Sequence, residues 1–210
     1  MRSQAFERFG GFMAILAGVA AFGYAVAFII VRTNAALSAL FLMLVGLLST
    51  AALVALYGRL RESDGAFALW ALLLGMAGAL ATAAHGAYDL AIAINPPATP
   101  NVDLPSQVDP RGFMTFGVAG LALLTVNWLI RRGDAGLPRG LGLVGYLSAV
   151  LLVVLYLGRL IILDATSPVI LVPALLNGFI VSPAWYVWLG LSLRRAADEA
   201  PVHAPAAASA

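Results

Sequence analysis

Cysteine and lysine are both absent from this 210-residue chain, and charge of either sign is scarce. The absence of cysteine excludes disulfides, thiolate metal sites, iron–sulfur clusters and cysteine nucleophiles. Only 10% of the residues are charged, against roughly a quarter in soluble domains. The formal net charge of +2 is too small to indicate binding to nucleic acid, so no nucleic-acid partner is expected.

Apolar sequence takes the place of these missing residue types: 62% of the chain is hydrophobic and its mean hydropathy is +0.95. Each long apolar run can cross a hydrocarbon layer of roughly 30 Å at about 1.5 Å per residue. The sequence therefore predicts an all-α fold, a polytopic transmembrane helical bundle of about six spans with the lipid bilayer as its surroundings. The expected spans are 10–31, 35–58, 66–94, 113–130, 140–163 and 168–193.

These spans leave room for a single membrane domain, residues 1–195, followed by a disordered cytoplasmic tail at 196–210 that is rich in alanine. The connector at 95–112 contains five prolines and is expected to be a semi-rigid loop. The first span could be mistaken for a cleaved signal peptide. Because its apolar run continues through Val31, an uncleaved signal-anchor helix is favoured.

Orientation follows from the arginines on alternate connectors. Nine lie on the side of the two termini and three on the other, and short loops with more arginine stay in the cytoplasm. The prediction is an inner or plasma membrane protein, multi-pass, with both termini cytoplasmic. Near the end of the last span, Trp185, Tyr186 and Trp188 precede Arg194 and Arg195, a pattern typical of an interfacial aromatic belt.

Small residues indicate where helices approach each other in lipid. In the third span a heptad-like stripe ends in His85 and Asp89, and in the fifth a similar stripe ends in Tyr156 and Arg159. Both stripes are expected to face inward. The stripe in the third span consists of Ala71, Gly75, Gly78, Thr82, His85 and Asp89. The stripe in the fifth span consists of Gly142, Gly145, Ala149, Leu152, Tyr156 and Arg159.

The ionisable ends of the two stripes lie at the same expected depth near the outer surface, so an ion pair between Asp89 and Arg159 is predicted. Two interpretations stay open. The pair either orients the helices, or belongs to the polar lining of an outward-facing pocket, because ionisable residues inside membrane bundles often mark substrate or proton pathways. Asn177, which lies between Pro173 and Pro183 in the last span, is added to this candidate pocket, although a structural kink with Asn177 bridging two helices is the favoured explanation. Asn127 is expected at the membrane interface.

Catalytic motifs are not found. One histidine in the spans excludes bis-histidine haem ligation within the chain, and no set of three metal ligands or phosphate loop is visible, so no cofactor or metal is expected. Enzymatic activity is unsupported. In its six-span layout, its proline-bearing outer connector and its final segment 183–190 (PAWYVWLG), the chain resembles the small uncharacterised six-helix integral membrane proteins of bacteria. That resemblance implies the fold and no particular activity.

The leading functional hypothesis is a small transporter or permease-like protein with its polar pocket open to the outside. The alternative is a non-catalytic membrane partner or assembly subunit, and an enzyme acting on lipid is a weaker third. The sequence leaves open whether the chain works alone, as a homodimer or with other membrane subunits.

Overall fold

Ten consecutive helical segments make up nearly all of the part of the chain that the computed structural model describes, which is residues 4–97, 111–132, 135–162, 164 and 166–199. None of these residues lies in a strand. The segments are α1 (Gln4–Ala25), η1 (Val26–Val31), α2 (Ala35–Leu60), α3 (Gly65–Ile94), η2 (Phe113–Val118), α4 (Ala119–Arg132), α5 (Arg139–Ile161), α6 (Pro168–Leu176), η3 (Asn177–Val181) and α7 (Ser182–Glu199).

Six of the resulting continuous helices are long and apolar enough to cross a membrane, as expected for a multi-pass membrane protein. These six spans run over Gln4–Val31, Ala35–Leu60, Gly65–Ile94, Phe113–Arg132, Arg139–Ile161 and Pro168–Glu199. The first and last extend beyond the apolar runs seen in the sequence. In particular, residues 196–199, which were expected to belong to a disordered tail, continue α7. Residues 200–210 and most of the proline-rich connector lie outside the described residues.

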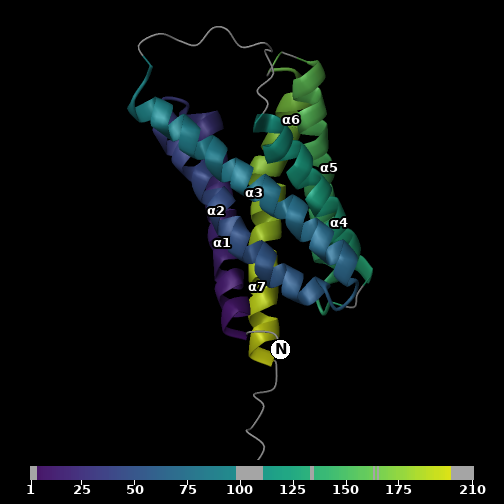
Figure 1. Cartoon of the computed structure of the whole chain (residues 1–210). Helices are drawn as coiled ribbons and strands as arrows, with labels where there is room; N and C mark the ends of the chain where they lie inside the picture. The colour runs from purple at the N-terminus through teal and green to yellow at the C-terminus, as the bar shows by residue number, and fades with distance from the viewer. Residues whose placement is uncertain (1–3, 98–110, 133–134, 163, 165, 200–210) are drawn as a thin grey trace, which may run out of the picture.

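The six spans pack together as one bundle (Figure 1). Each span packs against the next, and α7 packs against α1 to complete the ring. The first and last described residues lie at the same end of the molecule, called here the terminal end, and the other end is called the distal end. A salt bridge of 2.9 Å between Arg8 and Asp198 joins α1 to α7 at the terminal end.

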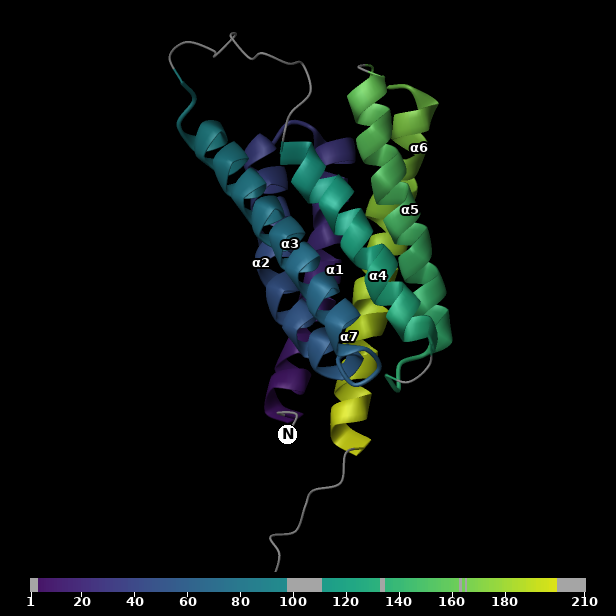
Figure 2. The ribbon, with the colours of Figure 1, turned by 45° about the vertical axis from the view of Figure 1, so that its right-hand side comes forward.

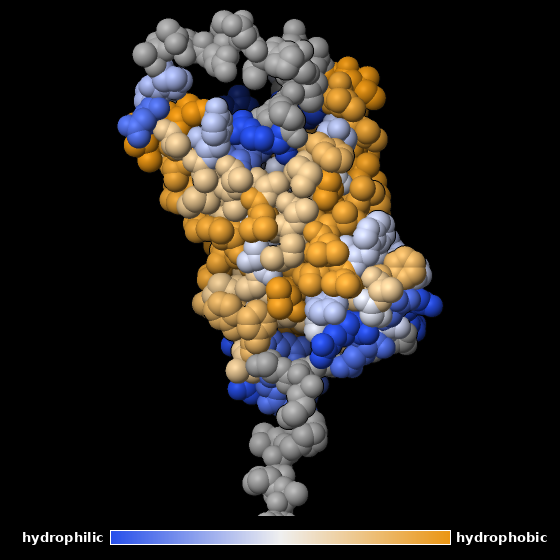
Figure 3. Space-filling model, viewed as in Figure 1, coloured by the Kyte–Doolittle hydropathy of each residue, from blue (hydrophilic) through white to orange (hydrophobic). Residues whose placement is uncertain are grey.

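The surface agrees with this arrangement. In the space-filling view a broad apolar band covers the middle of the molecule, and hydrophilic residues gather at both ends (Figure 3). Large exposed apolar side chains such as Leu73, Leu80 and Ile180 are consistent with a surface that faces lipid. The seam expected in α3 is confirmed near its middle, where Ala71, Gly75, Gly78 and Thr82 are all buried.

The largest cluster of buried apolar side chains occupies the terminal half of the bundle. It combines the terminal parts of α2, α4 and α7 with the beginnings of α3 and α5, as Leu56, Leu129, Leu141 and Leu189 illustrate. Buried positions in the distal half of α1, α2 and α3 are mostly small, for example Ala25, Ala39 and Ala83. The distal half of these three helices is therefore filled mostly by small side chains.

The close contact between α2 and α3 involves glycines that were not assigned to a seam. A Cβ added at Gly46 of α2 would lie 2.3 Å from the backbone nitrogen of Ala83, and one added at Gly86 of α3 would lie 2.3 Å from that of Met43. At Gly75 the nearest atom would be a flexible side-chain carbon of Leu53, at 3.1 Å. The α2–α3 contact thus depends on Gly46 and Gly86 more than on Gly75.

In Figure 2, α4 runs beside α3 and α5 runs beside α4. Three π-helical segments interrupt the spans: η1 near the distal end of the first span, η2 at the distal end of the fourth and η3 inside the sixth. Such segments often occur at functional sites. The sixth span begins at Pro168, a position that tolerates proline because no helical hydrogen bond is lost there. Ser167 precedes Pro168 and forms no side-chain cap. Instead, Asp164 Oδ1 accepts hydrogen bonds from the backbone and the hydroxyl of Thr166.

Candidate functional site

The distal end of α3 carries the ionisable residues that the sequence indicated. His85 and Asp89 are one helical turn apart, and His85 Nε2 lies 3.4 Å from Asp89 Oδ2. Only 14% of the His85 side chain is exposed, against 39% for Asp89. The carboxylate therefore lies at the margin of the bundle interior, while the imidazole lies deeper.

Asp89 forms its principal ion pair with Arg111, which precedes η2. Arg111 Nη1 donates a hydrogen bond of 2.8 Å to Asp89 Oδ1. The same guanidinium lies over the ring of Tyr88, 4.7 Å from its centroid, which places the cation against a polarised aromatic face. Two neighbouring residues of α3 thus hold one arginine and fix the distal end of the fourth span against α3.

His85 connects this pair to the π-helix η2. Its Nδ1 lies 3.4 Å from Thr115 Oγ1, and the Thr115 side chain is buried. The imidazole is therefore held between a carboxylate on its own helix and a hydroxyl on the next span.

A cavity of about 250 Å³ opens beside Asp89, between the distal ends of α1, α2 and α3. Its walls carry one carboxylate, one phenol ring, one phenyl ring, one serine hydroxyl and small or aliphatic side chains. The lining residues are Tyr24, Phe28, Ala35, Ser38, Ala39, Leu42, Asp89, Ile92 and Ala93. Hydrophilic residues are visible at this end of the space-filling view (Figure 3).

The helix periodicity of α2 places the cavity on the inner face of the ring. Ser38 and Leu42 line the cavity, and Ser49 follows Leu42 at a spacing of seven, on the same face of the helix. Ser49 Oγ hydrogen bonds at 2.8 Å to the hydroxyl of Tyr186 in α7. Because that hydrogen bond joins α2 to another span of the ring, the face that it shares with Ser38 points inward.

The expected ion pair between Asp89 and Arg159 is not formed. Among the described residues, Asp89 pairs with Arg111 and His85, whereas Arg159 is exposed at the end of α5. Both Asp89 and Arg159 nevertheless lie within electrostatic range of the Tyr24 hydroxyl. Arg159 therefore belongs to the surroundings of the cavity, although it neither lines it nor neutralises its carboxylate.

The other two residues proposed from the sequence lie outside the cavity wall. Tyr156 packs its ring against Phe113 of η2, with centroids 5.4 Å apart, and thus touches the segment that contains Thr115. Asn177 is buried at the start of η3, where its Oδ1 accepts a hydrogen bond of 2.8 Å from Ser148 Oγ of α5. In this structure Asn177 bridges two helices, which is the structural alternative considered above.

Two residues expected at the membrane interface are interior instead. Asn127 of α4 is completely buried, and its Oδ1 accepts a hydrogen bond of 3.1 Å from the indole nitrogen of Trp185. Its amide nitrogen donates to the carbonyl of Leu123 at 2.7 Å. Only 2% of Trp185 is exposed, so Trp185 and Asn127 face the interior of the bundle and not the membrane, while Trp188 is exposed as expected.

A buried ion pair at the terminal end was not foreseen. Arg59 Nε of α2 donates to Glu7 Oε1 of α1, and both side chains are at least nine-tenths buried. Arg59 had been counted among the nine arginines on the side of the termini, and no role was predicted for Glu7. The spacing of the two residues in the sequence gives no signal of their contact, because the contact depends on how α1 crosses α2.

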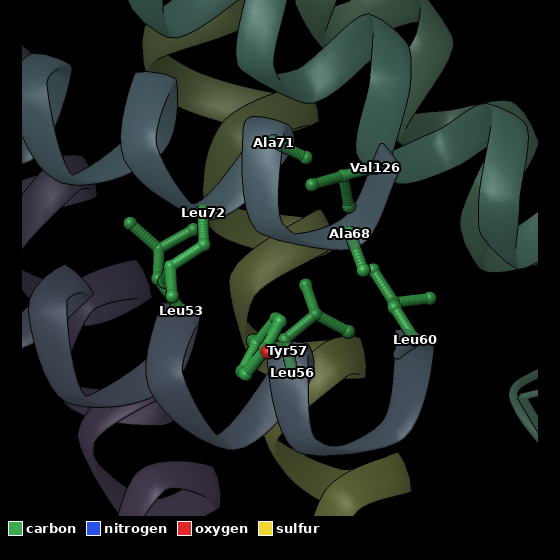
Figure 4. Close-up of a pocket in the computed structure, with 8 residues that line it drawn as sticks. All are labelled: Leu53, Leu56, Tyr57, Leu60, Ala68, Ala71, Leu72 and Val126. Carbon is green, nitrogen blue, oxygen red and sulfur yellow. The ribbon is translucent and has the colours of Figure 1, made fainter. Parts of the chain in front are cut away.

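A second hollow in the terminal half is too small to bind a solute. It lies between α2, α3 and α4, has a volume of about 10 Å³ and is lined almost entirely by apolar side chains, including Leu53, Leu72 and Val126 (Figure 4). A site of this size holds about one water molecule at most, and it offers few polar partners. The cavity beside Asp89 is therefore the candidate functional site.

In the described part of the chain, no group of three or more His, Asp or Glu side chains could hold a metal ion.

Comparisons with known proteins do not extend this assignment. No family model, no curated protein and no solved structure matches the chain.

Proposed function

We propose that this chain is a small transporter or permease-like protein of the inner or plasma membrane, with its termini in the cytoplasm and its distal cavity open to the outside. The observation that carries the proposal is the cavity of about 250 Å³ with the Asp89 carboxylate in its wall. The excess of arginine on the terminal side supports the orientation, nine residues against three.

The asymmetry of the bundle supports a transport function. Large apolar side chains close the terminal half, whereas the distal half has a cavity. Two π-helical segments, η1 and η2, also lie at the distal ends of their spans, and the third, η3, lies inside the sixth span. A bundle that is open at one end and closed at the other is what an alternating-access protein shows in one of its states. A volume of about 250 Å³ is slightly below that of typical drug-sized ligand sites, roughly 300–1,000 Å³, so the solute is expected to be small.

The alternative is a non-catalytic membrane partner or assembly subunit. It is favoured by the contact between Arg111 and Asp89, because an ion pair that already neutralises the carboxylate holds two spans together without any solute. The two functions differ in whether the cavity contains water that is continuous with the outside.

Single cysteines in this naturally cysteine-free chain test both orientation and access. Thr33→Cys places a thiol in the distal connection, Arg61→Cys places one just after α2 at the terminal end, and Ser38→Cys places one in the cavity wall. A membrane-impermeant thiol reagent applied to intact cells is expected to label positions 33 and 38 and to leave position 61 unlabelled. The matched control is Ala52→Cys, in the same helix but inside the apolar core, which should not react.

The outcomes separate the hypotheses. Labelling at position 33 without labelling at position 38 would show that the cavity is closed to water and would favour the assembly subunit. Labelling at position 61 in place of position 33 would reverse the orientation and reject an outward-facing cavity.

A further inference from the structure

The walls of the distal cavity have the chemistry of a cation site. Asp89 is the only charged residue among the described residues that line it, and its charge is negative. Tyr24 and Phe28, one helical turn apart on the first span, stack with centroids 5.4 Å apart and an angle of 19° between their planes. Both rings contribute to the same wall.

Aromatic faces and a carboxylate attract the same kind of ligand. The face of an aromatic ring is negative, so it stabilises a cation placed within about 6 Å of the ring centroid and repels an anion. The remaining walls are mostly methyl and aliphatic groups, with Ser38 as the one hydroxyl. Such surroundings suit a cation that carries carbon substituents better than a strongly hydrated metal ion, which needs several oxygen ligands.

We propose that this cavity binds a small organic cation, an amine or a quaternary ammonium compound, with its positive charge near Asp89 and its alkyl groups against Tyr24 and Phe28. This inference rests on the proposed function, because it assigns a class of solute to the same cavity. The electrostatic complement of the carboxylate is already present in the structure, since Arg111, which is not a lining residue, donates a hydrogen bond of 2.8 Å to Asp89 Oδ1.

Arg111 therefore acts as the resident counter-ion of Asp89 when no solute is bound. A cation that enters the cavity competes with the guanidinium for the same carboxylate, and the arginine retains the ring of Tyr88 as a second partner. Arg111 lies two residues before η2, so a weaker contact with Asp89 loosens one tie between α3 and the distal end of the fourth span, while the contact between His85 and Thr115 remains. Binding of the solute is thus coupled to the position of one span.

The test uses the full-length protein in lipid nanodiscs, with tetramethylammonium and choline as probes. The neutral isostere of choline, 3,3-dimethylbutan-1-ol, and acetate serve as controls for shape and for negative charge. Equilibrium dialysis with radiolabelled choline measures the Kd, and thermal unfolding reports binding of the unlabelled compounds. Choline and tetramethylammonium are expected to bind and to raise the melting temperature, whereas the isostere and acetate are not.

Two variants locate the site. Asp89→Asn is expected to weaken choline binding at least tenfold, whereas Asp198→Asn, which removes the same charge from the exposed surface at the terminal end, leaves the Kd unchanged. Phe28 is 58% exposed, so Phe28→Leu keeps the fold while it removes one aromatic face. The expected loss of choline affinity in this variant is about 2- to 30-fold, the range for cation–π contacts.

The result that overturns the inference is equal binding of choline and of its neutral isostere, equal losses in Asp89→Asn and Asp198→Asn, or preferential binding of acetate. If Ser38→Cys is labelled from outside but no organic cation binds, this inference fails and the proposed transport function stands. If Ser38→Cys is not labelled, the proposed function itself fails.

Discussion

The contact between α2 and α3 gives the most sharply defined prediction. Gly→Ala at position 86 adds a single carbon where two backbones meet. The new Cβ would lie 2.3 Å from the backbone nitrogen of Met43 and 2.7 Å from the carbonyl oxygen of Ala39. Ordinary contact begins at 3.4 Å, so the two helices must separate by about 1 Å to accommodate the added methyl group.

The expected loss of stability follows from two opposing effects. Overpacking of a close contact costs about 1–3 kcal/mol, and the upper end applies here because both obstructing atoms belong to backbone and cannot rotate away. Alanine recovers about 1 kcal/mol of helix propensity relative to glycine. We therefore expect Gly86→Ala to lower the free energy of unfolding by about 2 kcal/mol, roughly 30-fold in the folded-to-unfolded ratio. Gly46→Ala should behave similarly, because its Cβ would meet the backbone of Ala79 and Ala83.

Unfolding by sodium dodecyl sulfate in mixed micelles, followed by circular dichroism, measures these differences. The matched control is Gly58→Ala, which lies in α2 like Gly46 but whose Cβ would have no other atom within 4 Å. This control should be neutral or more stable by up to about 1 kcal/mol. If Gly86→Ala and Gly58→Ala are equally stable, close approach at position 86 is not what holds α2 against α3, and the reasoning is refuted.

Three further predictions concern the polar contacts between helices. Removing one member of the buried Glu7–Arg59 pair, as Glu7→Gln or Arg59→Gln, should lower the free energy of unfolding by about 3–5 kcal/mol in the same assay, because it leaves a buried charge without its partner. The double variant should lose less stability than the two single variants added together. A double-mutant cycle of Asn127→Leu and Trp185→Phe should give a coupling energy of about 0.6–1.7 kcal/mol, the range of hydrogen bonds between membrane helices, and a zero coupling would contradict the bond. Hydrogen bonds from Thr166 hold the pKa of Asp164 below its ordinary value. The contribution of Asp164 to the order of this connection is therefore present at neutral pH and is lost as the pH falls through the lowered pKa. Thr166→Val should raise that pKa toward its ordinary value in an NMR titration, and an unchanged pKa would reject the hydroxyl contact.

The six helices could be predicted from the sequence because hydropathy alone determines which segments are long and apolar enough to cross a membrane. The faces of α3 could be predicted in part, since small residues at helical spacing are buried at Ala71, Gly75 and Gly78. The positions of Gly46 and Gly86 in the α2–α3 contact could not be predicted, because each glycine meets the backbone of the other helix only at the particular crossing of α2 and α3. Nothing in either helix alone distinguishes them from Gly75.

The candidate site shows the same division. His85 and Asp89 lie on one stripe of a regular helix, so their proximity followed from the spacing. Arg159 was paired with Asp89 on depth alone, and depth fixes one coordinate of a residue but not the rotation of its helix. Arg111, the actual partner, follows a proline-rich connector whose sequence does not determine where its end returns to the bundle. The sequence therefore predicted that Asp89 belongs to the candidate site, but not that Arg111 is its counter-ion.

The close α2–α3 contact and the cavity are also physically connected. Gly86 packs against the carbonyl oxygen of Ala39, and Ala39 lines the cavity whose carboxylate, Asp89, lies one turn further along α3. Gly46 packs against Ala79 and Ala83, which are not among the lining residues and lie closer to the terminal end. A separation of the helices at position 86 must therefore move a wall of the cavity, whereas a separation at position 46 need not. If Gly86→Ala and Gly46→Ala lose equal stability but only Gly86→Ala loses affinity for choline, the spacing of α2 and α3 at their distal ends sets the dimensions of the binding site.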